Sequence, residues 1–145
     1  MDNNLKREII LDNYQDPYNK GLVDDDDYML TNTSSESCID ALAFQLKIED
    51  TKISDIRFDG EACAISTSAS SILIRTLIGM DIDEAKTVLT NYKNMINEKD
   101  YDKELLGELN VYDEIYKQPN RKNCALLPGL AIDSLINELN SKKNE

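Results

Sequence analysis

Residues 42–48 read Leu-Ala-Phe-Gln-Leu-Lys-Ile, and this stretch decides the fold. A large apolar side chain occupies every second position, which is the period of a strand with one buried face. The positions are Leu42, Phe44, Leu46 and Ile48. Residues 28–33 before this stretch and 52–58 after it are predicted to form two more strands. Because the connections between the three are short, we expect an antiparallel sheet that is buried on one face.

The rest of the chain has helical spacing of its apolar residues. Residues 4–14 predict a short opening helix, and residues 66–78 predict a second helix. Asp81, followed three residues later by a glutamate, resembles a capping box that opens a third. Residues 97–120 are polar and mixed, with room for a short helix, and residues 121–140 restore helical spacing. The order predicts an α+β fold, a three-stranded antiparallel sheet with helices packed on one face.

The size and charge of the chain narrow the function classes. With 145 residues, we expect residues 1–145 to form a single domain. No apolar run is long enough to span a bilayer, and the start lacks the layout of a signal peptide, so we expect a cytoplasmic protein without a membrane partner. The formal charge of -12 repels phosphate backbones, so we expect no nucleic acid partner. This charge serves either a partner with a basic patch or solubility alone.

The chain has three cysteines and no histidine. The absence of histidine removes Ser-His-Asp and Cys-His catalysis, together with the commonest metal ligand. A reducing cytoplasm does not favour structural disulfides, so the thiols are core residues, metal ligands or nucleophiles. Any bound metal must therefore be held by sulfur and oxygen.

Each cysteine lies at a predicted element boundary. Cys38 lies between the first two strands, Cys63 lies where a helix follows the third strand, and Cys124 lies at the start of the last helix. The N–H groups at a helix start favour a thiolate there, and Asp40 would project to the same side as Cys38 in an extended segment. Three thiolates and one carboxylate would complete a tetrahedral zinc site or hold an iron-sulfur cluster. The spacing alone favours three unrelated thiols over a shared site, because positions 38, 63 and 124 form no C-x-x-C signature.

Three motifs resemble those of the SufU branch of the SufU/IscU (NifU N-terminal-like) iron-sulfur cluster assembly family. Residues 12–21 (DNYQDPYNKG) resemble the opening element of that family, and residues 121–128 (RKNCALLP) resemble the start of its last helix. Residues 58–70 (FDGEACAISTSAS) give the most specific match. The long gap between the second and third cysteines is typical of SufU, and the histidine that IscU-type proteins have beside the last cysteine is absent. Asn123 stands at that position, where the family pattern usually has a lysine.

The resemblance implies a function and a set of site residues. Cys38, Asp40, Cys63 and Cys124 would bind zinc, and Cys38 would accept persulfide sulfur from a SufS-type cysteine desulfurase, which implies sulfurtransferase activity. Ile39 replaces the flexible glycine of the C-G-D motif of the family, so the loop that carries Cys38 is expected to be stiffer.

The same four ligands also suit a different role. The alternative is a scaffold that assembles a labile iron-sulfur cluster and passes it to apo-proteins or to downstream cluster assembly proteins, with iron or a cluster in place of zinc. A third interpretation is a purely structural zinc site.

Overall fold

The computed structural model describes residues 1–35 and 40–143, and it describes the side chains of these residues apart from 32–35, 40 and 140–143. Cys38 and Ile39 therefore lie outside the described residues. The described elements comprise four α-helices, three strands and three short 3-10 helices. In chain order they are α1 (Asn3–Gln15), β1 (Met29–Ser35), β2 (Asp40–Glu49), β3 (Lys52–Glu61), α2 (Ala64–Leu77), α3 (Ile82–Ile96), η1 (Lys103–Leu105), η2 (Gly107–Tyr112), η3 (Ile115–Lys117) and α4 (Pro119–Lys143).

The three strands form one antiparallel sheet in the order β1-β2-β3, as the sequence predicts. Phe44 lies opposite Thr31 on one side and opposite Phe58 on the other. The register shifts between Lys47 and Ile48, where the β2–β3 pairing is irregular. One face of the sheet carries the buried side chains Leu42, Phe44, Leu46, Ile53, Ile56 and Phe58.

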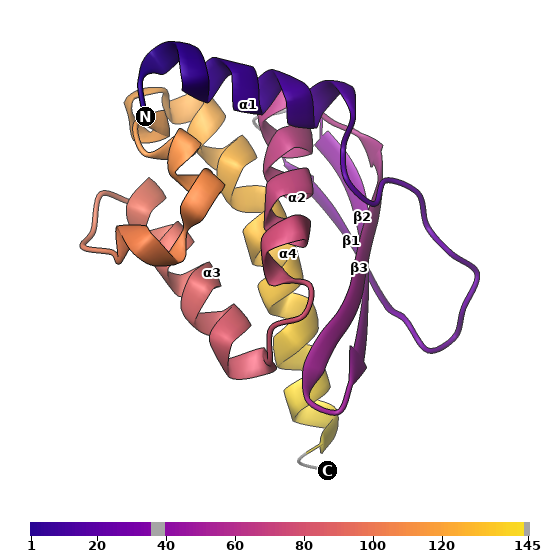
Figure 1. Cartoon of the computed structure of the whole chain (residues 1–145). Coiled ribbons are helices and arrows are strands. Elements are labelled where there is room, and N and C mark those ends of the chain that lie inside the picture. Colours follow the sequence, from indigo (N-terminus) through magenta and orange to yellow (C-terminus); the bar gives the residue numbers. More distant parts are fainter. Residues whose placement is uncertain (36–39, 144–145) are drawn as a thin grey trace.

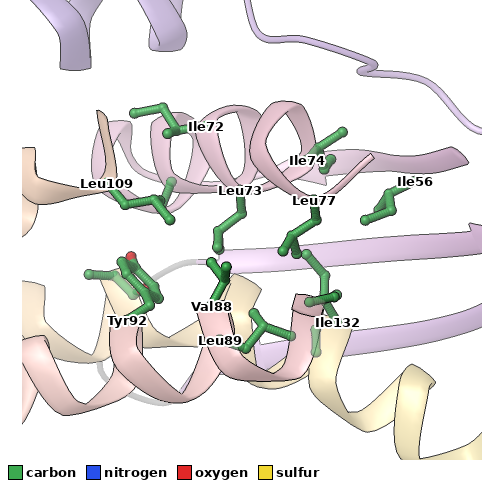
Figure 2. Packing of buried hydrophobic residues seen from close by; sticks show 14 of the residues in the cluster. Ile56, Ile72, Leu73, Ile74, Leu77, Val88, Leu89, Tyr92, Leu109 and Ile132 are labelled. Atoms are coloured by element: carbon green, nitrogen blue, oxygen red, sulfur yellow. The ribbon is translucent and has the colours of Figure 1, made fainter. Parts of the chain in front are cut away.

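The helices lie on one side of the sheet, which confirms the predicted arrangement (Figure 1). α2 and α4 contact the sheet and each other, α3 packs against α4, and α1 packs against α2. Figure 2 shows Leu73 and Leu77 of α2 lying close to Val88 of α3 and Ile132 of α4. These side chains are at most 3% exposed, and full burial of a side chain of this kind contributes about 1.5–3 kcal/mol.

The other face of the sheet is partly covered by the segment between α1 and β1. The amide of Gly21 donates to the carbonyl of Phe58 at 2.7 Å, so this segment pairs briefly with β3. The Gln45 side chain then holds the backbone of Val23 through two hydrogen bonds, of 2.9 and 2.8 Å. Gln45 is polar but only 7% exposed. The two hydrogen bonds to Val23 offset the cost of burying its amide group.

The segment between α3 and α4 contributes to the core. The sequence leaves room for a short helix here, and the structure has the three 3-10 helices η1, η2 and η3. The Asn110 amide holds the segment by donating to the carbonyls of Lys103 and Gly107, both at 2.9 Å. Among the described residues, no helix is both long and apolar enough to cross a membrane.

Candidate metal centre

Cys63 is the N-cap of α2. It lies in the two-residue link between β3 and α2, with extended backbone angles, and its sulfur accepts the amide hydrogen of Ser66 at 3.5 Å. The side chain is half-buried. The first amides of a helix lack intrahelical partners, and the sulfur of Cys63 accepts a hydrogen from one of them. The structure therefore confirms the predicted position of Cys63 at a helix start.

Cys124 does not lie at a helix start, which corrects the sequence-based prediction. α4 begins at Pro119, so Cys124 lies more than one turn inside the helix. Its side chain is 1% exposed and belongs to the hydrophobic core, with the sulfur 3.5 Å from the carbonyl oxygen of Asn120 in the preceding turn. The missed signal was Pro119, because proline is favoured at the first position of a helix.

Ser66 joins the two cysteines. Its hydroxyl donates to the carbonyl oxygen of Cys124 at 2.9 Å, and it lies 3.7 Å from the sulfur of Cys63. Ser66 is fully buried, so its hydrogen bond to Cys124 is shielded from water, whereas its contact with the half-buried Cys63 is only partly shielded. Ser66 lies within the 58–70 motif, but it was not predicted to contact the cysteines. The sequence feature that indicates a need for such a donor is Pro128. It lies four residues after Cys124 and has no N–H to donate to the Cys124 carbonyl.

Asp40 lies at the same end of the sheet by backbone position. It is the first residue of β2 and pairs with Ser35, while the next residue, Ala41, pairs with Glu61 at the end of β3. The chain continues from Glu61 to Cys63, so the backbones of Asp40 and Cys63 approach the same edge. The side chain of Asp40 is not described.

The structure does not test the full set of four ligands. Cys38 lies outside the described residues, and the part of the chain that the structure covers contains no group of three or more Cys, Asp or Glu side chains arranged to hold a metal. The described residues bring Cys63 and Cys124 to one serine. The convergence of Cys38 and Asp40 on these two cysteines stays a prediction.

The chemical types of the four predicted ligands, three sulfurs and one carboxylate oxygen, nevertheless suit zinc or an iron-sulfur cluster. Cysteine sulfur and carboxylate oxygen are both zinc ligands, and cysteine sulfur also holds iron-sulfur clusters. The sulfur of Cys63 already accepts an N–H, as a metal-binding thiolate commonly does. The residues present therefore fit zinc or a cluster, with Cys63 and Cys124 as two of the ligands.

Two buried tyrosines lie near the described cysteines, Tyr112 near Cys63 and Tyr92 against the residue after Cys124. The hydroxyl groups of Tyr112 and Ser68 lie 2.5 Å apart, and the Tyr92 hydroxyl donates to the carbonyl of Ala125 at 2.7 Å. Burial raises the pKa of Tyr112, and the nearby Cys63 acts in the same direction, while the hydrogen bond with Ser68 opposes them. Burial also raises the pKa of Tyr92. Both phenols are therefore neutral at physiological pH, and the Tyr92 hydroxyl acts as a hydrogen-bond donor.

A groove of about 670 Å³ lies next to Cys63 and is bounded by α1, α2, η2, η3 and the start of α4. Apolar side chains line it together with four basic residues and a single acidic one. The basic residues are Lys6, Arg7, Lys117 and Arg121, and the acidic residue is Glu114. The chain has 28 acidic and 16 basic residues, so the charge of this groove is opposite to that of the molecule.

Two of the four groove cations, Lys6 and Lys117, form ion pairs with described carboxylates. Lys6 forms a 2.6 Å ion pair with Asp113, whose hydrogen bond raises the pKa of the Lys6 ammonium against the opposing effect of burial. Lys117 lies 3.5 Å from Glu114 in an exposed pair. The groove reaches Ala64, the residue after Cys63, so a molecule bound there would lie beside Cys63.

A three-stranded antiparallel sheet with a one-sided helical layer and Cys63 at the sheet end is the architecture of an iron-sulfur cluster assembly protein. The chain belongs to the family of the NifU-like N terminal domain, whose model matches residues 5–125.

Individual relatives extend this finding. The chain is 29% identical over 130 residues to the zinc-dependent sulfurtransferase SufU of Bacillus subtilis, covering 89% of this chain and 87% of the relative. It is also 29% identical to the iron-sulfur cluster assembly scaffold protein IscU of Streptococcus pyogenes, over 92% of this chain and 84% of that one. Among solved structures, it is similar to a putative iron-sulfur cluster assembly scaffold protein for the SUF system from Fervidobacterium islandicum AW-1. The TM-score is 0.79 at 26% identity, over 89% of this chain and 94% of that one.

Proposed function

We propose that this chain is a zinc-dependent sulfur acceptor that takes persulfide sulfur from a cysteine desulfurase during iron-sulfur cluster assembly. The observation that carries the proposal is the junction at Ser66, which contacts the sulfur of Cys63 and the backbone of Cys124. The family and the similarity to a protein named as a zinc-dependent sulfurtransferase support it. Cys38, Asp40, Cys63 and Cys124 would hold the zinc.

Cys38 is the proposed sulfur acceptor. Bound zinc would keep a thiolate deprotonated and protected until it is needed. Once released, the Cys38 thiolate attacks the outer sulfur of a persulfide on the desulfurase. A new S–S bond forms on Cys38, the old S–S bond breaks, and the desulfurase cysteine leaves as a thiolate. No external oxidant or reductant is needed, because one persulfide replaces another.

The cationic groove supports a partner that approaches with acidic side chains. Arg7 and Arg121 lie on it with the ion-paired Lys6 and Lys117, and the groove ends at Ala64 beside Cys63. A desulfurase segment that carries carboxylates would be attracted here, while the remaining surface of this acidic chain would repel it. Such a segment would bring the persulfide donor close to the cysteines.

The second candidate function is that of a scaffold on which a labile cluster is built and then passed to apo-proteins. The similarity to the IscU scaffold of Streptococcus pyogenes favours it. One carboxylate among three thiolates would hold a cluster less firmly than four thiolates, which suits release. The cluster is then the cargo of the protein.

A sulfur-transfer assay separates the two functions. Purified reduced protein is analysed for zinc, mixed with a cysteine desulfurase and cysteine, and each thiol is examined for added sulfur by mass spectrometry. We expect about one zinc per chain, sulfur on Cys38, and loss of desulfurase stimulation in Cys38→Ala. Full stimulation by Cys38→Ala would refute the transfer role. A cluster that forms from anaerobic iron and sulfide and then moves to an apo-ferredoxin would instead establish the scaffold role.

A further inference from the structure

α4 contains a proline in its interior, at position 128. In an α-helix, the N–H of each residue donates to the carbonyl four residues earlier, and proline has no N–H. The carbonyl four residues before Pro128 is that of Cys124. The backbone of a proposed metal ligand is therefore deprived of its regular helical donor.

Ser66 supplies a donor to this carbonyl from another helix. Its hydroxyl reaches the Cys124 oxygen at 2.9 Å, and the serine is fully buried. A buried carbonyl without a donor is costly, so a donor from α2 compensates for the missing N–H of residue 128. Pro128 and Ser66 are thus two parts of one arrangement, although they lie far apart in the sequence.

The same serine also contacts the other cysteine. Its amide donates to the sulfur of Cys63 at 3.5 Å, and its hydroxyl lies 3.7 Å from that sulfur. A single residue therefore touches both cysteines, at the sulfur of Cys63 and at the main chain of Cys124. Because Ser66 is the third residue of α2, the N-terminal end of α2 is tied to the interior of α4 at the level of the thiols.

We propose that Ser66 is a positioning residue that sets the distance between Cys63 and Cys124, and that Pro128 keeps the Cys124 carbonyl available for it. The consequence for metal binding rests on the proposed function, while the link between the two helices does not. Through these contacts Ser66 fixes the backbone of Cys124 relative to the sulfur of Cys63, as two ligands of one metal ion require. Its own contact with the metal is not required.

The link is tested first in metal-free protein. Urea unfolding is measured in EDTA and a thiol reductant for the wild type, Ser66→Ala, Pro128→Ala and the double variant. We expect Ser66→Ala to lower the urea midpoint clearly in the wild-type background and little in the Pro128→Ala background, because the new N–H of residue 128 then serves the Cys124 carbonyl. Equal shifts in the two backgrounds would overturn the link.

The positioning role is tested by zinc affinity, measured by competition with a chromophoric zinc chelator. Loss of a residue that orients metal ligands typically weakens metal binding by about 10- to 100-fold, and we expect this for Ser66→Ala. Ser70→Ala is the matched control. Ser70 is also a fully buried serine of α2, and its hydroxyl bonds to the Ser66 carbonyl at 2.8 Å, within the same helix. We expect it to stay within about threefold of the wild type, since it contacts neither cysteine.

The cobalt(II) absorption spectrum provides a readout that reports ligand geometry and not stability. We expect Ser66→Ala to shift the visible bands of the cobalt-substituted protein, and Ser70→Ala to leave them in place. If the wild type binds zinc and Ser66→Ala matches Ser70→Ala in affinity and spectrum, the positioning role is wrong and the proposed function stands. If the wild type binds no zinc, the proposed function and the positioning role both fail. The link between α2 and α4 is then decided by the urea unfolding of the four metal-free proteins alone.

Discussion

Gly60 is the residue at which a single methyl group should damage this fold most directly. It lies on β3 opposite Leu42 of β2, with a positive φ of 127°. A Cβ at this position would lie 2.1 Å from the carbonyl oxygen of Ala41 and 3.1 Å from the carbonyl carbon of the same residue. Both atoms belong to the backbone of the neighbouring strand, so no side-chain rotation relieves the overlap.

The cost of Gly60→Ala has two parts. Holding an alanine at this positive φ costs about 1–3 kcal/mol. Relieving the overlap requires β2 and β3 to separate by about 1 Å or more, which weakens the pairing beside the cysteines. We expect a total loss of about 4 kcal/mol or more in the free energy of unfolding, a size reached only when a substitution conflicts with the structure directly.

Gly107→Ala is the matched control for the backbone angle. Gly107 also has a positive φ, of 51°, but a Cβ there would meet nothing within 4 Å. We expect this variant to lose only about 1 kcal/mol. Urea unfolding of both variants, analysed from midpoint and slope, compares the two losses. If Gly60→Ala is no more than about 1 kcal/mol less stable than Gly107→Ala, the argument from backbone overlap is wrong.

Three further predictions concern hydrogen bonds that lie away from the cysteines. The Tyr28 hydroxyl donates to Asp55 at 2.6 Å, which, with burial, raises the pKa of Tyr28 to about 12. The tyrosine of the unfolded chain ionises near pH 10, so the stabilisation by this hydrogen bond is complete below that pH and is lost between pH 10 and 12. The difference in the free energy of unfolding between the wild type and Tyr28→Phe, measured with urea, should therefore shrink over this range. Gln45→Ala removes both hydrogen bonds to the backbone of Val23. We expect tryptic cleavage of the segment between α1 and β1 to accelerate about tenfold, and an unchanged rate would show that these bonds do not hold the segment. Ser71→Ala removes two hydrogen bonds, of 2.7 and 2.9 Å, that join α2 to α1 and to the loop after α1. We expect the free energy of unfolding in urea to fall by about 2 kcal/mol, and a loss below about 0.5 kcal/mol would contradict the importance of these bonds.

The sheet and the helical layer were predictable because their signals are local and periodic. The alternation in residues 42–48 reflects a strand with one buried face, and the structure buries Leu42, Phe44 and Leu46. Asp81 caps α3 by accepting the amide hydrogen of Glu84 at 3.0 Å, as the sequence predicts. Such features depend on residues within one turn or one strand pair, so they can be recognised without knowledge of the rest of the fold.

The position of Cys124 was predicted wrongly because two signals compete. The polar run before it resembles a helix start, but Pro119 begins α4 earlier and places the cysteine in the core. The role of Ser66 was also not predictable from local patterns, since its partner lies on another helix. A polar residue in a buried helix is explained only when its tertiary hydrogen bond is known.

Adjacent carbonyls of α4 receive side-chain hydrogen bonds from two different helices. Ser66 of α2 donates to Cys124, and Tyr92 of α3 donates to Ala125. Local opening of this part of α4 must therefore break contacts to both partners at once, so the three helices should open as one cooperative unit. In native-state hydrogen exchange, we expect amides around Cys124 to exchange only through the largest opening of the molecule. The part of the chain that carries a proposed ligand would then be among its most slowly exchanging regions, unlike the mobile loops that hold many functional residues.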